Sequence, residues 1–355
     1  MFSYHLNKKA FWIAALATLL LLALVFIGSR NLQNFDAALI AYLFGTVFAT
    51  FGIVYRYAVW LQRPPTWLYF KRTWQILFSG RFLPYLWLFL RKSVRNIGFQ
   101  YFIRPRGSRR WWGHFLLATG CMLAFAVTIP LTLGWIHFTM NPATGMDPEM
   151  NKLYEAHVFG FKVFEFRLGS IIASLIFNVL SWSSWLVIIG VGLFIYRRFT
   201  NGGLIATQSF EGDWLPLILL VAIAVTGLGL SYDYAFLGGT TYEFMAVTHA
   251  VTVIVFLVWI PFGKFFHIIQ RPAQIGVYLY HTEGNRKGMA VCPHTGKEFT
   301  SQQHVDDLKA VTQELGIDFT IDEHRSHLDY SPEGKRSMLA QAHLKARQES
   351  GRYFG

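Results

Sequence analysis

The sequence predicts an all-α integral membrane protein: a six-transmembrane-helix bundle followed by a small, mostly polar cytoplasmic C-terminal region. Two features indicate this fold class. Of the 355 residues, 53% are apolar and only 15% are charged, whereas about 25% of residues are charged in an ordinary soluble domain. The apolar residues also gather in uninterrupted runs of roughly 20, the length that a helix needs to cross about 30 Å of hydrocarbon.

Six apolar runs are long enough to span a membrane, and they lie at residues 10–28, 37–58, 112–137, 168–195, 214–232 and 245–267. The first run follows Lys8 and Lys9, so it begins as a signal peptide does. Its apolar stretch is long for a signal peptide, however, and residues 28–30 form a poor cleavage site. We therefore expect this segment to be retained as a helix.

The distribution of charge predicts the orientation. The stretch from Tyr55 to Arg110, which joins the second and third runs, carries 12 Lys and Arg and no Asp or Glu: Arg56, Arg63, Lys71, Arg72, Arg81, Arg91, Lys92, Arg95, Arg104, Arg106, Arg109 and Arg110. Such an excess marks a cytoplasmic loop. The segments predicted to face the other side are acidic, with Asp36, Asp147, Glu149, Glu155, Glu165, Asp233 and Glu243. We expect a multi-pass protein with both termini in the cytoplasm.

The basic connection, residues 59–110, is interleaved with Trp, Phe and Leu. Positive charge of this kind can also attract nucleic acid. Because the segment lies between two membrane spans, we instead expect an interfacial helix, roughly Trp74 to Val94, on anionic lipid headgroups and no binding of nucleic acid. Docking of a cytoplasmic partner is a second use for the same surface.

The chain divides by composition into three parts. Residues 1–36 form an extra N-terminal helix and outer loop, residues 37–272 form the membrane domain with its basic connection 59–110, and residues 273–355 form a polar cytoplasmic region. The last part contains a short β-like run from Gly276 to Tyr280 and helical segments at 302–315 and 335–347. The two cysteines, Cys121 and Cys292, exclude a disulfide framework and an iron–sulfur cluster built from this chain alone.

Two histidines in the last apolar run carry the functional hypothesis. His249 and His267 are 18 residues apart, which is five turns of a helix, so both would lie on one face and about 27 Å apart along its axis. Ionisable residues within a span are costly and are often functional. One imidazole near each membrane face suits two b-type haems. The structural alternatives are an interfacial His267 and a hydrogen-bonded His249 at the start of the helix.

Each haem needs a second axial ligand from another element. His114, at the cytoplasmic start of the third run, matches the expected depth of His267. Four cations at that level are expected to bind the haem propionates: Arg109, Arg110, Lys264 and Arg271. For His249, the ligand is His137 if Pro130 kinks the third helix, or else His157. A protein without a second haem is the third possibility.

These residues also resemble a known family. The stretch 249–267, with Pro261-Phe262-Gly263-Lys264 before the second histidine, resembles the last span of the gamma (cytochrome b) subunit of respiratory nitrate reductase. It is also similar to related membrane subunits of heterodisulfide-reductase-like and sulfite-reduction-associated complexes. Residues 110–117 resemble the opening of the other ligand helix in that family. The resemblance covers roughly residues 37–272. The family's first ligand helix carries two histidines ten residues apart, however, and no second histidine lies at that distance from His114 here.

The resemblance implies a membrane cytochrome b subunit of a respiratory complex in a bacterial or archaeal cytoplasmic membrane. Such a subunit exchanges electrons between the quinone/quinol pool and an iron–sulfur subunit, often joined to a molybdopterin or other catalytic subunit. No substrate chemistry is expected from this chain alone. In the outer loop, Glu155 and Glu165 are candidate proton acceptors, and Lys152 and Lys162 are candidate donors to a quinone oxygen. The alternatives are a polytopic transporter and a membrane anchor without a cofactor.

Overall fold

A computed structural model describes residues 6–141, 152–323 and 325–351, and most of these residues are helical. Two of the acidic residues used to predict orientation, Asp147 and Glu149, lie outside the described residues. All six predicted apolar helices are present in the described chain. Their bounds are Lys8–Gly28 (α1), Ala37–Leu61 (η1 and α2), Ser108–Thr132 (α5), Ile171–Thr200 (α6), Phe210–Leu237 (η6, α8 and η7) and Tyr242–Trp259 (α9). Each is long and apolar enough to cross a membrane.

The chain forms two compact units. The first comprises Met1–Ala58 and Val94–Ile269, and the second comprises Val59–Ser93 and Gln270–Gly355. The boundary near residue 270 is close to the expected one at 272. The first part of the basic connection, however, belongs to the C-terminal unit, whereas the sequence-based division had included it in the membrane domain.

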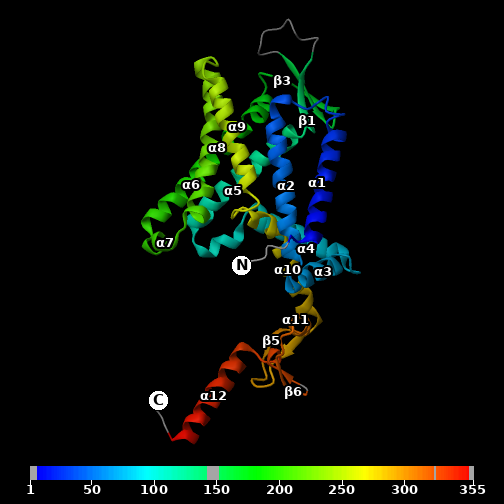
Figure 1. The fold of residues 1–355 in the computed structure, drawn as a ribbon, viewed down its shortest axis with the longest axis vertical. Helices are drawn as coiled ribbons and strands as arrows, with labels where there is room; N and C mark the ends of the chain where they lie inside the picture. Colours follow the sequence, from blue (N-terminus) through cyan, green and yellow to red (C-terminus); the bar gives the residue numbers. More distant parts are fainter. Residues whose placement is uncertain (1–5, 142–151, 324, 352–355) are drawn as a thin grey trace. The chain divides into compact units, whose positions relative to one another are not determined.

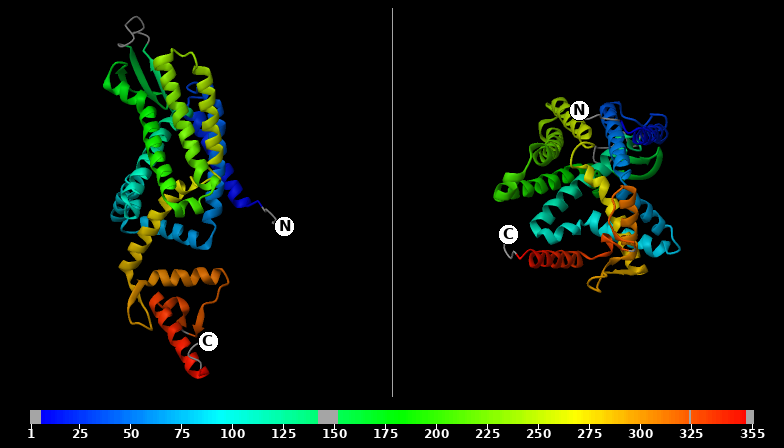
Figure 2. Two further views of the ribbon diagram at one scale, coloured as in Figure 1. Left: turned by 90° about the vertical axis from the view of Figure 1, so that its left-hand side faces the viewer. Right: turned by 60° about the horizontal axis from the view of Figure 1, so that its bottom comes forward.

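The helices of the first unit run side by side, with the strands β1–β3 at one end (Figure 1). The two turned views show that α8 and α9 lie side by side along their lengths (Figure 2). The core lies between α6, α8 and α9 and includes Val191, Leu220 and Phe256. Helices α5 and α6 approach closely at Gly120, where a Cβ atom would lie 2.6 Å from the Ser183 carbonyl oxygen. Small residues allow such close packing of helices in membranes.

A three-stranded antiparallel sheet, in the order β1-β2-β3, follows α5. The strands are Ile136–Met140 (β1), Leu153–Val158 (β2) and Phe161–Arg167 (β3). The prediction that the third span reaches residue 137 is therefore wrong, since α5 continues through Pro130 but ends at Thr132. Gly134, at a φ of 67°, turns the chain in a conformation that glycine adopts without steric cost. His137 consequently lies on a strand and not at a helix end.

The last predicted span is also interrupted. Helix α9 ends at Trp259, and α10 begins at Phe266 and continues to Lys287. Pro261 lacks an N–H group, which favours an end to the helix, and any side chain at Gly263 would overlap the indole of Trp259. His249 and His267 therefore do not share one continuous helix, and the argument from five whole turns is wrong.

The other short elements of the first unit are η2 (Val94–Gly98), η3 (Tyr101–Arg106) and α7 (Gly202–Thr207).

The second unit begins with α3 (Pro64–Leu77) and α4 (Phe82–Ser93), so the expected interfacial helix is two helices. The remaining elements are β4 (Met289–Val291), β5 (Glu298–Ser301), α11 (Gln302–Glu314), β6 (Thr320–Asp322), β7 (Arg325–Ser326), η8 (His327–Asp329) and α12 (Pro332–Ser350). The two helical segments expected there are confirmed as α11 and part of α12. The prediction of a β-like run from Gly276 to Tyr280 is wrong, because these residues lie within α10.

This unit has its own core. Leu279 and Tyr280 of α10 are fully buried against Ile76, Leu77 and Tyr85 of α3 and α4. Charged pairs surround this core: Arg72 bonds Asp307 at 2.6 Å, and Glu283 bonds Arg286 at 2.7 Å and also accepts from Tyr85. These bonds, chiefly the one from Arg286, hold the pKa of Glu283 at about 2, well below its ordinary value. The second unit therefore has a packed core, although its composition is mostly polar.

Candidate functional site

The imidazole rings of His114 and His267 lie close together in the first unit. Their ring centres are 6.5 Å apart and the ring planes are inclined at 66°. His114 comes from the second turn of α5, and His267 is the second residue of α10. Metal–nitrogen bonds of about 2 Å on either side of one metal would place two axial imidazole centres on the order of 6 Å apart. The separation therefore fits a pair of axial ligands.

Hydrogen bonds orient both rings in the same way. The Nδ1 atom of His267 lies 2.5 Å from the Lys264 carbonyl oxygen, and the Nδ1 atom of His114 contacts the side-chain oxygen Oε1 of Gln100. An oxygen acceptor requires that Nδ1 carries the proton, so the lone pair of each neutral ring is on Nε2. Metal-binding histidines nearly always have a partner of this kind on the other ring nitrogen.

Gln100 is a candidate site residue that the sequence analysis missed. Gln100 is only 5% exposed, and its backbone is left-handed, with a φ of 51°. A residue other than glycine costs on the order of 1–3 kcal/mol in such a conformation, and it persists where the surroundings require it. Here it brings the amide to His114. A lone Gln within the aromatic stretch 99–102 was the available signal.

The interruption between α9 and α10 supplies the acceptor for His267. Backbone carbonyls at a helix end lack intrahelical partners, and within a membrane they must be satisfied by other groups. Arg56 of α2 does this by donating to the carbonyl oxygens of Pro261 at 2.6 Å and Gly263 at 3.2 Å. Its guanidinium also lies 4.3 Å from the ring centre of Phe266. Arg56 thus stabilises the turn that exposes the Lys264 carbonyl.

Two of the four predicted propionate-binding cations have other partners. The Lys264 ammonium lies 2.8 Å from Asp213, which also bonds Arg198 at 3.3 Å. Arg271 belongs to the second unit, where it donates to Gln274 at 2.8 Å. The remaining two cations, Arg109 and Arg110, line a small cavity together with Arg197 of α6. Phe194 lines the same cavity, and its ring centre is 6.3 Å from that of His114.

His249 has a different environment. Its Nδ1 atom bonds the Thr226 hydroxyl of α8 at 2.9 Å, and Thr226 also donates to the Ala222 carbonyl at 2.7 Å. Within the described part of the chain, no hydrogen bond or ring contact joins His249 to His137 or His157. The structure therefore brings together the pair expected for the inner haem but not the pair expected for the outer one.

His137 and His157, the two alternative partners of His249, are instead neighbours of each other. They are paired across β1 and β2, with ring centres 4.8 Å apart and planes only 10° from parallel. Burial lowers the pKa of His137, and the nearby His157 and Arg30 lower it further. The Nε2 atom of His157 is 3.0 Å from the Thr139 hydroxyl and 3.4 Å from Glu155. Rings stacked face to face do not direct nitrogens at one shared metal.

The same sheet gathers the charged outer-loop candidates. Lys162 bonds Glu155 at 2.9 Å and also bonds Glu165. The hydrogen bond from Lys162 is the main reason why the pKa of Glu155 is lowered. Glu155 is therefore ionised near neutral pH, and the ion pair with Lys162 makes it a weaker proton acceptor than an ordinary glutamate.

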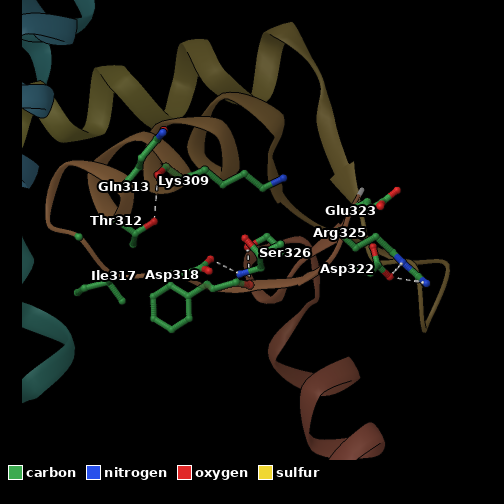
Figure 3. A pocket seen from close by; sticks show the side chains of 12 residues that line it. Lys309, Thr312, Gln313, Ile317, Asp318, Asp322, Glu323, Arg325 and Ser326 are labelled. Atoms are coloured by element: carbon green, nitrogen blue, oxygen red, sulfur yellow. Dashed lines mark hydrogen bonds and ion pairs between the residues drawn. The ribbon is translucent and has the colours of Figure 1, made fainter.

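Other arrangements in the described residues fit a protein-held metal less well. The described residues contain no group of three or more His, Cys, Asp or Glu side chains that would hold an ion, whereas protein-bound zinc takes three or four such ligands. A groove of about 600 Å³ in the second unit is lined by Lys309, Asp322 and Arg325 among others, without a histidine (Figure 3). Its charges are engaged locally: Arg325 bonds Asp322 at 2.8 Å, and Lys309 bonds Asp329 at 2.7 Å.

Comparisons of the chain with models of protein families, with curated proteins and with solved structures find no match. The likeness to cytochrome b subunits consequently rests on the residues quoted above.

Proposed function

We propose that this chain is a membrane cytochrome b subunit in which His114 and His267 would hold a b-type haem. It would exchange electrons between the quinone/quinol pool and an iron–sulfur or molybdopterin partner subunit. The observation that carries this proposal is the pair of imidazoles 6.5 Å apart, each with an oxygen acceptor at Nδ1. His249 also bonds an oxygen through Nδ1, so the feature particular to His114 and His267 is the second imidazole at this distance.

The surfaces of the six apolar helices support a location in a membrane. Only 6% to 28% of the apolar window of each helix is buried. Large side chains such as Trp12, Phe44 and Ile171 are 69%, 69% and 80% exposed. Surfaces of this kind are stable against hydrocarbon and would aggregate in water. With the basic connection inside, both termini are cytoplasmic and the His114–His267 pair lies toward the cytoplasm.

A b-type haem, when bound, supplies reversible one-electron transfer. The residues of this chain provide its ligands and tune them. Gln100 and the Lys264 carbonyl hold the rings and, as acceptors from Nδ1, increase the basicity of Nε2. On the opposite side, Glu155 and Glu165 would accept protons released by a quinol, and Lys162 would donate a hydrogen bond to a quinone oxygen. We propose one haem and not two, because His249 of the first unit has no second imidazole beside it in the described residues, whereas the rings of His114 and His267 are 6.5 Å apart.

A reduced-minus-oxidised visible spectrum of the purified full-length protein tests the proposal. We expect the α band of a low-spin b-type haem, and we expect His267→Ala to remove it. His343→Ala is the matched control, because His343 lies on the exposed surface of α12 in the second unit. A purified, folded protein without this band would falsify the proposal.

One observation favours a second candidate. Interrupted membrane helices are a feature of transporter binding sites, where free backbone groups contact the substrate, and the stretch 260–265 is such an interruption. Here Arg56 already occupies the carbonyls of Pro261 and Gly263, so they are not offered to a substrate. The spectrum separates the two functions, because a transporter would carry no haem.

A further inference from the structure

A small cavity lies between the start of α5 and the end of α6. It has a volume of about 50 Å³ and is lined by Arg109, Arg110, Leu193, Phe194, Tyr196, Arg197 and Thr200. Three of these seven residues are arginines. The cavity therefore has the sign of charge that attracts an anion.

The three guanidinium groups are not neutralised within the described part of the chain. None of them forms an ion pair there, whereas the adjacent Arg198 bonds Asp213. The Nε atom of Arg197 is buried and has no hydrogen-bond partner among the described residues. A buried donor without a partner is costly, and clustered positive charges repel one another. An anion with several oxygens would relieve both costs.

The size of the cavity limits the ligand. About 10–15 Å³ of such space holds one water molecule, so 50 Å³ accommodates a group of a few heavy atoms. Arginine binds phosphate through two parallel hydrogen bonds, and the amino end of a helix adds partial positive charge. A single phosphate group satisfies these conditions, whereas an extended organic molecule would not fit inside.

The location indicates the source of the phosphate. Exposed aromatic side chains stand at the same helix ends, with Trp112 at 47%, Tyr196 at 57% and Phe199 at 68% exposure. Aromatic residues of this kind collect at the membrane–water interface, at the level of the lipid headgroups. Basic pockets between helices on the cytoplasmic side bind anionic headgroups. We infer that Arg109, Arg110 and Arg197 form a binding site for the headgroup phosphate of an anionic phospholipid.

Native mass spectrometry of the full-length protein with added phosphatidylglycerol or phosphatidylcholine tests this inference. We expect retention of phosphatidylglycerol in preference to phosphatidylcholine. Arg197→Gln should weaken phosphatidylglycerol binding about fivefold, the effect of one interfacial arginine, and Arg197→Lys should retain part of it. Arg106→Gln is the matched control, since Arg106 is an exposed arginine of η3 outside the cavity, and it should leave binding unchanged.

Three results would overturn the inference. The first is equal retention of the two lipids by the unaltered protein. The second is saturation of the site by inorganic phosphate at concentrations no higher than those of phosphatidylglycerol, which would identify a free anion as the ligand. The third is loss of haem with unchanged lipid binding in Arg197→Gln, which would assign the cavity to a propionate.

If Arg197→Gln does not fold, the double variant Arg109→Gln/Arg110→Gln gives the same comparison. Lipid retention does not require haem, so this site and the haem proposal fail independently.

Discussion

Two groups of histidines in the first unit differ in how they are held. The rings of His114, from α5, and His267, from α10, face each other at 6.5 Å between their centres. His249 bonds Thr226, while His137 and His157 stack on each other across two strands. Both groups were expected to bind haem on the basis of matching depth. The difference shows that depth alone does not pair two histidines, because the surrounding hydrogen bonds decide where each ring points.

The largest expected effect comes from removing one ligand of the first pair. His114→Ala should abolish haem binding, because a b-type haem of this kind needs both axial imidazoles. His137→Ala should leave the haem content unchanged. Haem per protein, measured from the pyridine haemochromogen spectrum, compares the two variants. Equal losses in both would contradict the distinction between the two groups.

Removing the acceptor of His114 should have the next largest effect. Gln100→Leu keeps the approximate size of the side chain but cannot accept the hydrogen bond from Nδ1. Loss of such a partner typically weakens metal binding about 10- to 100-fold. Haem titration of the apoprotein measures the change, and Gln100→Glu, which restores an acceptor, should recover most of the affinity. Full affinity in Gln100→Leu would show that the contact with His114 has no role.

The turn between α9 and α10 should tolerate no side chain at Gly263. Gly263→Ala forces a Cβ into the Trp259 indole, and overpacking of this kind costs about 1–3 kcal/mol. It should also displace the Lys264 carbonyl and so reduce haem affinity. Gly192→Ala is the control, because no atom lies within 4 Å of the added Cβ. Thermal unfolding measures stability, and an unchanged midpoint in Gly263→Ala would be inconsistent with the observed turn.

A smaller effect is expected in the outer group. Thr226→Val removes the hydroxyl that bonds His249, and hydrogen bonds between membrane helices contribute about 0.6 kcal/mol on average. Stability should fall by roughly that amount, while the haem spectrum stays the same. A clear change in the spectrum would instead place His249 at a haem.

The smallest effect concerns protonation on the outer sheet. Burial lowers the pKa of His137 below its ordinary value of 6.5, and Arg30 contributes. Below pH 6.5 the unfolded chain would bind a proton that the folded His137 does not, so this residue reduces stability as pH falls. Arg30→Gln should raise the pKa of His137 in an NMR titration. An unchanged pKa would exclude an effect of Arg30.

The sequence by itself determined the six apolar helices, because hydropathy and length are local properties of the chain. It also paired His114 with His267, since both lie at the ends of apolar runs that are predicted to meet the same membrane face. Only the tertiary structure decided how these rings are oriented. Gln100 and Arg56 act on residues 14 and 205 positions away, and such contacts leave no periodic pattern.

The same reason explains the errors. Helix α9 was predicted to continue to His267, because hydropathy does not register that a proline and a glycine end the helix where Arg56 satisfies the freed carbonyls. His137 was placed on a helix, because the pairing of β1 with β2 joins residues that are distant in sequence. Local composition therefore fixed which segments are apolar helices, and non-local hydrogen bonding decided where they end and which histidines meet.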